Sequence, residues 1–320
     1  MKRIKYPDRN SREFALLVAD YKIIFIAKLP QKETEWRSWK LAHHVTNIPE
    51  TVEELLCADV DVLSDVYDRF VALGYPVSVK NATGDTIRNP DLAVLDKIFN
   101  YTRAYDGKIA RFFEDYAEKL AIGSCNYCET AYINVYTLVG NSNGSLKTEK
   151  RHHFDVDHFL PKSICPIVGL SLFNFVPSCQ VCNSRIKLAN VIGTKKADWE
   201  KFNPASKDYC FDDNVRIRLR MHRGPDTSFR KRGQYYIHFR CKNGFDMPVS
   251  FFHLEERYDF HKVEAMRIKQ LKARYPRSAR VMIAGLLKTS EKRVREDIFH
   301  SKYLTDNNRC FAKLTRDMLK

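Results

Sequence analysis

The sequence has no apolar run long enough to cross a membrane. The longest near its start, IIFIA at 23–27, is too short and is flanked by lysines. The opening MKRIKYPDRN is basic but has neither the apolar core nor the cleavage site of a signal peptide. There is no internal repeat and no low-complexity tract. We therefore expect a cytoplasmic protein with no membrane partner.

Acidic residues are in short supply. The chain has 39 Asp and Glu against 54 Lys and Arg, which gives a net charge of +15 and a pI near 9.3. Such a charge suggests a polyanionic partner, nucleic acid before an acidic membrane surface. A solubilising basic surface would give the same total. Residues 254–320 alone hold 17 Lys and Arg against 9 Asp and Glu, so this segment carries +8 of the charge.

With 320 residues, 44% of them hydrophobic, the chain is long and apolar enough for a globular protein with a buried core. Helical spacing of apolar residues predicts helices over 51–74, 89–105 and 107–121. Alternation predicts half-buried strands at 215–222 and 234–241, and a further helix runs from Leu254 until Pro276. The predicted fold is α+β. It has a helical N-terminal region at 1–121 that could dock a partner, a cysteine-rich core at 122–192 and a basic α+β region at 193–320.

Nine cysteines are an odd number, and a cytoplasmic chain is not expected to form a disulfide framework. Four of them form two CxxC pairs, Cys125 with Cys128 and Cys179 with Cys182. Two such pairs complete a tetrahedral all-cysteine site of the kind that holds structural Zn²⁺. A redox dithiol would need only one pair, and four unrelated buried thiols are the plain alternative. The paired spacing favours structural zinc.

The stretch FDVDHFLPKS, at 154–163, lies between the two pairs and places Asp155, Asp157 and His158 almost side by side. It could be a solvated acidic turn, a metal site or an acid/base centre. Phosphodiester hydrolysis needs a base for water, a divalent cation and a fixed geometry between them. Histidine has a suitable pKa for the base, and carboxylate and amide oxygens suit Mg²⁺ or Mn²⁺. Asn183 follows the last paired cysteine, where a helix NSRIKLAN is predicted to begin and to present it to the cation.

The ordered set of CxxC, DVDHFLPKS, Asn174 and CQVCNSRIK over 125–190 resembles the HNH endonucleases, also called ββα-metal or His-Me finger nucleases, in a four-cysteine form. The resemblance implies a zinc-stapled ββα-metal nuclease core with His158 as the general base. It implies Asp157 and Asn183 as ligands of the catalytic ion, and Asn174 as the residue that fastens the loop orienting the histidine. The family name expects histidine where Asn183 stands, and an amide ligand favours Mg²⁺ or Mn²⁺ over zinc or nickel.

Three nearby residues have competing interpretations. Arg185 and Lys187, on the predicted helix beside the site, are candidates to contact nucleic-acid phosphates, and an ordinary solvated helix face is the alternative. For Asp155, a solvated strand residue is favoured over a partner of the metal ligands.

The segment 201–219 also resembles the flank of bacterial HNH proteins that accompany an ATPase in phage-defence systems such as Septu and retron-linked relatives. This resemblance implies a partner ATPase and a role in anti-phage defence. The expected function is a metal-dependent endonuclease acting on DNA. A zinc-stabilised nucleic-acid-binding subunit without chemistry is the alternative, and a scaffold subunit with a vestigial nuclease fold is a third interpretation. The binding subunit would explain the charge and the cysteines, but not the four residues at nuclease positions.

Overall fold

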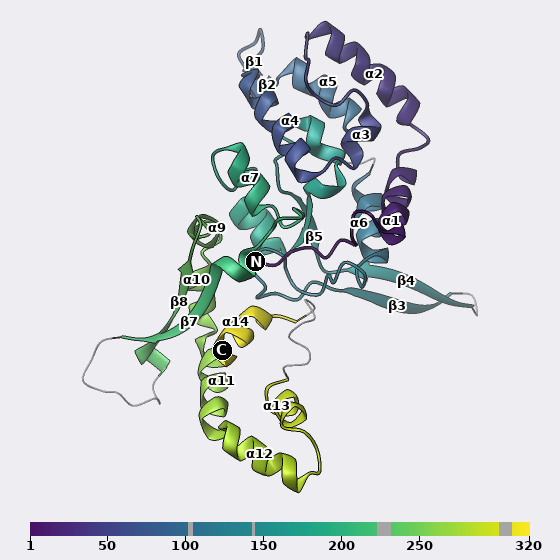
Figure 1. Cartoon of the computed structure of the whole chain (residues 1–320). Helices are drawn as coiled ribbons and strands as arrows, with labels where there is room; N and C mark the ends of the chain where they lie inside the picture. The colour runs from purple at the N-terminus through teal and green to yellow at the C-terminus, as the bar shows by residue number, and fades with distance from the viewer. Residues whose placement is uncertain (102–104, 143–144, 223–231, 301–308) are drawn as a thin grey trace. The chain divides into compact units, whose positions relative to one another are not determined.

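The computed structural model (Figure 1) describes residues 1–101, 105–142, 145–222, 232–300 and 309–320. It is a mixture of helices and two-stranded antiparallel hairpins, which confirms the predicted α+β class. The chain divides into two compact units. The N-terminal unit comprises residues 3–122 and 133–209, and the C-terminal unit comprises 1–2, 123–132 and 210–320. The predicted three-part division of the sequence stays a prediction. None of the helices within the described ranges is long and apolar enough to cross a membrane.

The N-terminal unit is mainly helical. Its α-helices are α1 (Arg12–Ile23), α2 (Leu29–Ala42), α3 (Val52–Leu56), α4 (Val60–Ala72), α5 (Pro90–Ile98), α6 (Asp106–Asp115) and α7 (Lys196–Phe202). Its hairpins pair β1 (Ser78–Lys80) with β2 (Thr86–Arg88), β3 (Val135–Ser142) with β4 (Ser145–His152), and β5 (Asp155–His158) with β6 (Phe175–Ser178). Two 3₁₀ turns, η1 (Pro166–Leu170) and η2 (Leu172–Asn174), and a π-helix, η3 (Val181–Lys187), complete the unit.

The helix predicted over 51–74 forms as two helices. Thr51 caps α3 in a reciprocal capping box with Glu54, and α4 begins after a short break. Leu63 and Phe70 of α4 are buried along one stripe, and burial of such side chains contributes about 1.5–3 kcal/mol each. Gly74 follows α4 with φ +72°, a left-handed conformation that suits glycine after a helix.

Aromatic side chains fill the interior of the N-terminal unit around β6 and η1. Phe113 of α6 packs edge-on against Phe175 of β6, with ring centroids 6.2 Å apart, and both rings are fully buried. The Tyr21 hydroxyl of α1 donates a hydrogen bond to the Leu170 carbonyl at 2.7 Å. These contacts hold in place the two segments that flank His158.

The C-terminal unit contains one described hairpin and several helices. β7 (Val215–Met221) pairs antiparallel with β8 (Tyr235–Cys241), which confirms the strands predicted at 215–222 and 234–241. The other elements are α8 (Phe211–Asn214), η4 (Arg232–Gln234), α9 (Asp246–Phe251), α10 (Leu254–Phe260), α11 (Lys262–Arg274), α12 (Arg277–Leu286), α13 (Glu291–Phe299) and α14 (Ala312–Leu319). The helix predicted from Leu254 to Pro276 forms as α10 and α11, which meet at His261.

The β7–β8 hairpin is amphipathic. On one face Ile217 and its cross-strand neighbour Phe239 are buried, and Tyr258 of α10 packs edge-on against Phe239 with ring centroids 5.2 Å apart. Figure 1 shows α10 and α11 running beside this hairpin. Because successive strand residues point to opposite faces, the alternate positions of β7 belong to the other face. Those positions are occupied by Arg216, Arg218 and Arg220.

Candidate active site

The stretch FDVDHFLPKS lies on β5 and on the turn that follows it. Asp157 pairs with Val176 of β6 in the strand register, and His158 pairs with Phe175. Every residue of β6 is buried, and Asp157 and His158 are themselves only 5% and 8% exposed. After β6, the first cysteine of the second pair, Cys179, precedes the π-helix η3, and the second, Cys182, lies within it. The local order is therefore strand, strand and helix.

A cavity of about 720 Å³ opens on this framework. Residues from α6, β5, the following turn and η3 line it, and its polar lining includes Asp155, Asp157, His158, Lys162 and Asn183. Three of the residues singled out from the sequence, Asp157, His158 and Asn183, therefore share one cavity. Asn174 is fully buried and does not line the cavity, but it bonds to the loop between β5 and η1.

His158 is held in one orientation. Its Nε2 lies 3.0 Å from the carbonyl oxygen of Gly169. A carbonyl can only accept a hydrogen bond, so Nε2 carries the proton and Nδ1 keeps a lone pair. The ring is packed edge-on by Tyr101, with centroids 4.5 Å apart, and lies against Phe175 at 4.9 Å. Burial, with a smaller contribution from the nearby Lys162 ammonium, lowers the pKa of His158 to about 3. The imidazole is therefore neutral near pH 7, which is the form able to accept a proton.

Asn174 fastens the loop that carries the Gly169 carbonyl. Its Oδ1 accepts a hydrogen bond from the Leu160 amide at 2.7 Å. Its Nδ2 donates to the carbonyls of Leu160 and Val168, each at 3.0 Å. One amide side chain thus joins both ends of the 160–168 loop. The partner of the His158 ring is the carbonyl of the next residue, so Asn174 sets the position of that carbonyl.

Lys187 lies inside the site rather than on its surface. Its side chain is fully buried, with Nζ 3.2 Å from Oδ2 of Asp157 and 2.6 Å from the carbonyl oxygen of His158. Burial lowers the pKa of Lys187, and the Asp157 carboxylate opposes that shift. The carboxylate expected to hold the catalytic cation therefore already faces a fixed ammonium. Of the two residues considered for phosphate contact, only Arg185 is exposed.

Asn183 contacts Asp155. The Asn183 amide donates to Oδ2 of Asp155 at 3.1 Å, and the Ser184 hydroxyl donates to the same oxygen at 3.3 Å. Asp155, interpreted from the sequence as a solvated residue, is half-buried and bonded to η3. The hydrogen bonds of the two expected metal ligands thus go to different partners, Lys187 for Asp157 and Asp155 for Asn183.

The two cysteine pairs form a cluster. The sulfurs of Cys125, Cys128, Cys179 and Cys182 all lie within 4.8 Å of one another, and all four residues are buried. The amide and hydroxyl of Thr130 donate to the Cys128 sulfur at 3.4 and 3.1 Å, an arrangement that stabilises a thiolate. Four convergent sulfurs fit tetrahedral thiolate ligation, in which each Zn–S distance is about 2.3 Å. Over the ranges that the structure describes, no other set of three or more Cys, His, Asp or Glu side chains converges in this way.

Two contributors to the site have no signal in the sequence motifs. Tyr101 packs on the His158 ring from a distant part of the chain, and a lone tyrosine carries no pattern that would identify it. Gly169 contributes through its backbone carbonyl. A Cβ at position 169 would lie 3.4 Å from the Cβ of Lys162, an ordinary van der Waals contact, so nothing in the context PIVGL marks this carbonyl as the partner of His158.

No family model, curated protein or solved structure matches this chain.

Proposed function

We propose that the N-terminal unit carries a metal-dependent endonuclease site of the HNH type, which hydrolyses phosphodiester bonds of DNA. The observation that carries the proposal is the state of His158. It is a neutral, buried imidazole whose Nε2 is engaged by the Gly169 carbonyl, so Nδ1 is the basic atom. Oxygen donors from Asp155, Asp157 and Asn183 line the same cavity.

In this proposal His158 accepts the proton of the attacking water at Nδ1, and the Gly169 carbonyl keeps the ring in the tautomer that can do so. Asp157 and Asn183 would hold Mg²⁺ or Mn²⁺, since carboxylate and amide oxygens are the donors that these hard cations prefer. The bound ion would stabilise the charge that develops on the phosphoryl and leaving oxygens. Asn174 acts as a positioning residue because it holds the loop that holds the histidine.

We propose two further roles for the surroundings of the site. The four-cysteine cluster would hold a structural Zn²⁺ that fixes the end of β6 and the start of η3. On the resemblance of residues 201–219 alone, the enzyme would act in bacterial anti-phage defence together with a partner ATPase.

One observation favours the alternative, a nucleic-acid-binding subunit without chemistry. Lys187 neutralises Asp157, and Asn183 and Ser184 bond to Asp155, so these carboxylates have protein partners without any ion. A subunit that never binds a catalytic ion would need such internal partners.

The test is nicking of supercoiled plasmid in Mg²⁺ or Mn²⁺ by the full chain and by His158→Ala. Loss of a general base should lower the rate by about 10²- to 10⁴-fold. His153→Ala is the matched control, because His153 is an exposed histidine near the same strand. Equal nicking by the parent and by His158→Ala would contradict the base assignment. Binding without cleavage, even with the partner ATPase supplied, would favour the alternative.

A further inference from the structure

The positive charge of the chain is concentrated in one part of it. Residues 210–320 hold 26 Lys and Arg against 13 Asp and Glu, a net charge of +13 out of the +15 of the whole chain. The β7–β8 hairpin belongs to this segment, and one face of β7 carries Arg216, Arg218 and Arg220 in alternation. The arginines of β7 therefore belong to the segment that carries most of the net charge.

Two of these arginines face solvent. Arg218 and Arg220 are exposed, and within the described residues neither has an ion pair or hydrogen bond to a carboxylate. Lys269 of α11 lies near them. Burial, together with the like charges of Lys272 and Arg218, lowers the pKa of Lys269, as expected where cations gather.

These side chains surround a hollow of about 540 Å³ at the edge of β7. Its cations come from three elements, β7, α11 and the end of α14. They are Arg216, Arg218, Arg220, Lys269 and Lys320. We call this set the β7 basic surface. Asp317 is the acidic residue in its lining.

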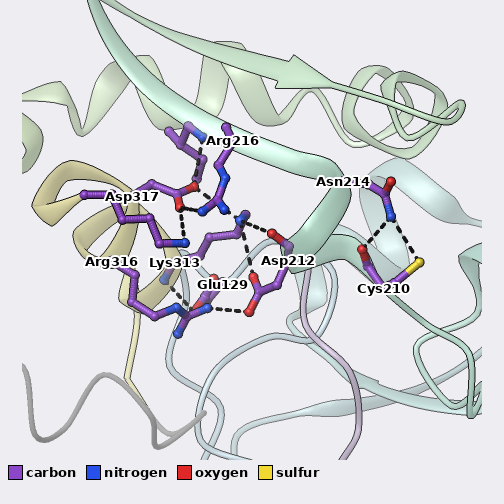
Figure 2. Close-up of polar contacts among 10 residues, drawn as sticks. Glu129, Cys210, Asp212, Asn214, Arg216, Lys313, Arg316 and Asp317 are labelled. Carbon is purple, nitrogen blue, oxygen red and sulfur yellow. Dashed lines mark hydrogen bonds and ion pairs between the residues drawn. The ribbon is translucent and has the colours of Figure 1, made fainter.

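The Asp317 carboxylate is directed into the protein, where it is only 3% exposed (Figure 2). It accepts from Arg216 at 3.0 Å and from the backbone amide of Ile217 at 2.9 Å, and it pairs with Lys313 at 3.2 Å. This carboxylate therefore joins α14 to β7 and offsets Arg216. Among the residues that the structure describes, no carboxylate forms an ion pair with Arg218, Arg220 or Lys269.

A second set of ion pairs holds α14 in place, as Figure 2 also shows. Lys313, which is almost fully buried, lies 3.3 Å from Oδ1 of Asp212, and Arg316 lies 2.8 Å from Oδ2 of the same residue. The β7 basic surface is thus built on a fixed helix and strand.

We propose that the β7 basic surface binds the phosphodiester backbone of a nucleic acid, at a site distinct from the His158 cavity. Alternate residues of a strand lie about 7 Å apart, so the arginines form a row that can meet successive phosphates. Guanidinium groups match phosphate oxygens in bidentate geometry, and a two-stranded antiparallel ribbon is a shape that fits a nucleic-acid groove. Tyr236 lies opposite Arg220 in the register and adds an aromatic ring to the same face.

This proposal does not depend on the proposed catalytic activity. The test therefore uses the full chain carrying His158→Ala, which prevents cleavage during the measurement. Fluorescence anisotropy of a labelled DNA duplex would be recorded over a range of salt concentrations. The test variant adds Arg218→Gln, Arg220→Gln and Lys269→Gln. The control adds Arg277→Gln, Lys288→Gln and Lys292→Gln, which remove three exposed charges of the same segment.

We expect the test variant to bind the duplex at least about tenfold more weakly at low salt, and the control to change by no more than about threefold. The slope of log K against log salt should become shallower by about 2 to 3 in the test variant, because each phosphate contact contributes about 0.9 for B-DNA. Single-stranded DNA and duplex RNA probes would show which backbone is preferred. Thermal unfolding of each variant would check that the fold is kept.

Three results would overturn the proposal. One is an equal loss of affinity in the test and control variants, which would show that total charge alone attracts the nucleic acid. Another is the absence of binding by the parent to all three probes, the DNA duplex, single-stranded DNA and the RNA duplex, at low salt. The third is displacement of the duplex by polyglutamate as effectively as by an equal concentration of nucleic-acid charge, which would identify an acidic polypeptide as the preferred ligand.

Discussion

Two regions of this chain use charge in opposite ways. Residues 1–209 hold 28 Lys and Arg against 26 Asp and Glu, a net charge of +2, whereas residues 210–320 hold 26 against 13, a net charge of +13. In the first region, the central charged groups are buried and paired, as Lys187 and Asp157 are. In the second, a row of cations on β7 faces solvent.

The difference separates two physical tasks. A buried, nearly neutral site can fix the orientation and protonation state of one imidazole, because each polar atom has a defined partner. An exposed row of cations fixes no orientation, but it attracts a polyanion and weakens as salt is added. Changes in the first region should therefore act on stability and rate, and changes in the second on affinity and on its dependence on salt.

Both regions have these properties only in the folded chain. The largest effect of a single substitution is therefore expected at the four-cysteine cluster. Apparent zinc-binding free energies in small zinc domains are about 10–16 kcal/mol, so Cys125→Ser or Cys179→Ser should abolish zinc binding and folding together. Metal analysis and circular dichroism would measure both. Cys241→Ser, outside the cluster, is the control. Folded parent protein without about one zinc per chain would contradict the assignment.

The next effect should appear in the N-terminal unit. Lys187→Met leaves the buried Asp157 carboxylate without the charge of Lys187, and loss of one member of a buried ion pair costs about 3–5 kcal/mol of unfolding free energy. Added Mg²⁺ should restore part of this loss if Asp157 can hold the ion. Urea unfolding with and without Mg²⁺ measures both quantities.

Lys196→Met is the matched control for Lys187→Met, because the ion pair of Lys196 with Asp65 is solvent-exposed and contributes about 0–1 kcal/mol. Equal losses of unfolding free energy in the two variants would contradict the expectation that the buried ion pair contributes more than the exposed one. A loss that Mg²⁺ does not reduce would argue against Asp157 as a ligand.

In the C-terminal unit, Asp317→Asn should cost about 2–3 kcal/mol, somewhat less than a fully isolated buried pair, since Lys313 retains Asp212 and Arg216 is partly exposed. DNA affinity should not fall, because Arg216 loses its acidic partner. Asp297→Asn, in an exposed pair with Arg293, should change stability by no more than about 0.5 kcal/mol. A parallel loss of DNA affinity in folded Asp317→Asn protein would break the separation of the two tasks.

The smallest effect concerns pH. Burial lowers the pKa of His158 to about 3, below its ordinary value near 6.5, so the unfolded chain binds a proton more readily than the folded one. The neutral ring is compatible with full stability above about pH 6.5, and stability falls as the pH drops through the window between these two pKa values. From about pH 7.5 to about pH 5.5, the parent should lose about 1.4 kcal/mol more than His158→Gln. Equal losses by urea unfolding would show that His158 is not held neutral.

The sequence predicted what depends on local pattern. Alternation placed β7 and β8 to within about one residue at each end, which is the usual accuracy for a two-residue period. The spacing of the cysteine pairs predicted the cluster, because four sulfurs at such spacing have few other uses. The division of 51–74 into α3 and α4 was missed, since the apolar stripe continues across the break between them.

The contacts inside the cavity could not be predicted. Lys187 was placed beside the site on a helix beginning at Asn183, but η3 begins at Val181 and is a π-helix, whose i→i+5 hydrogen bonds rotate each side chain relative to an α-helix. Leu188 then ends it with φ +51°. In this backbone conformation Lys187 points inward to Asp157, and Asn183 reaches Asp155. The catalytic roles, the DNA substrate and the partner ATPase stay predictions.

The clamp that Asn174 forms has a consequence for how this chain could vary between related proteins. The Asn174 amide joins residues 160 and 168, and the carbonyl of the following residue, Gly169, accepts the hydrogen bond of His158. The number of residues in the loop is therefore fixed. Side chains along it can be exchanged most readily at its half-buried positions, 162–164. A single insertion between them would displace the Gly169 carbonyl by up to about 3.8 Å, the distance between successive Cα atoms, and would release the ring. Related proteins should therefore tolerate substitutions in this loop but not insertions or deletions.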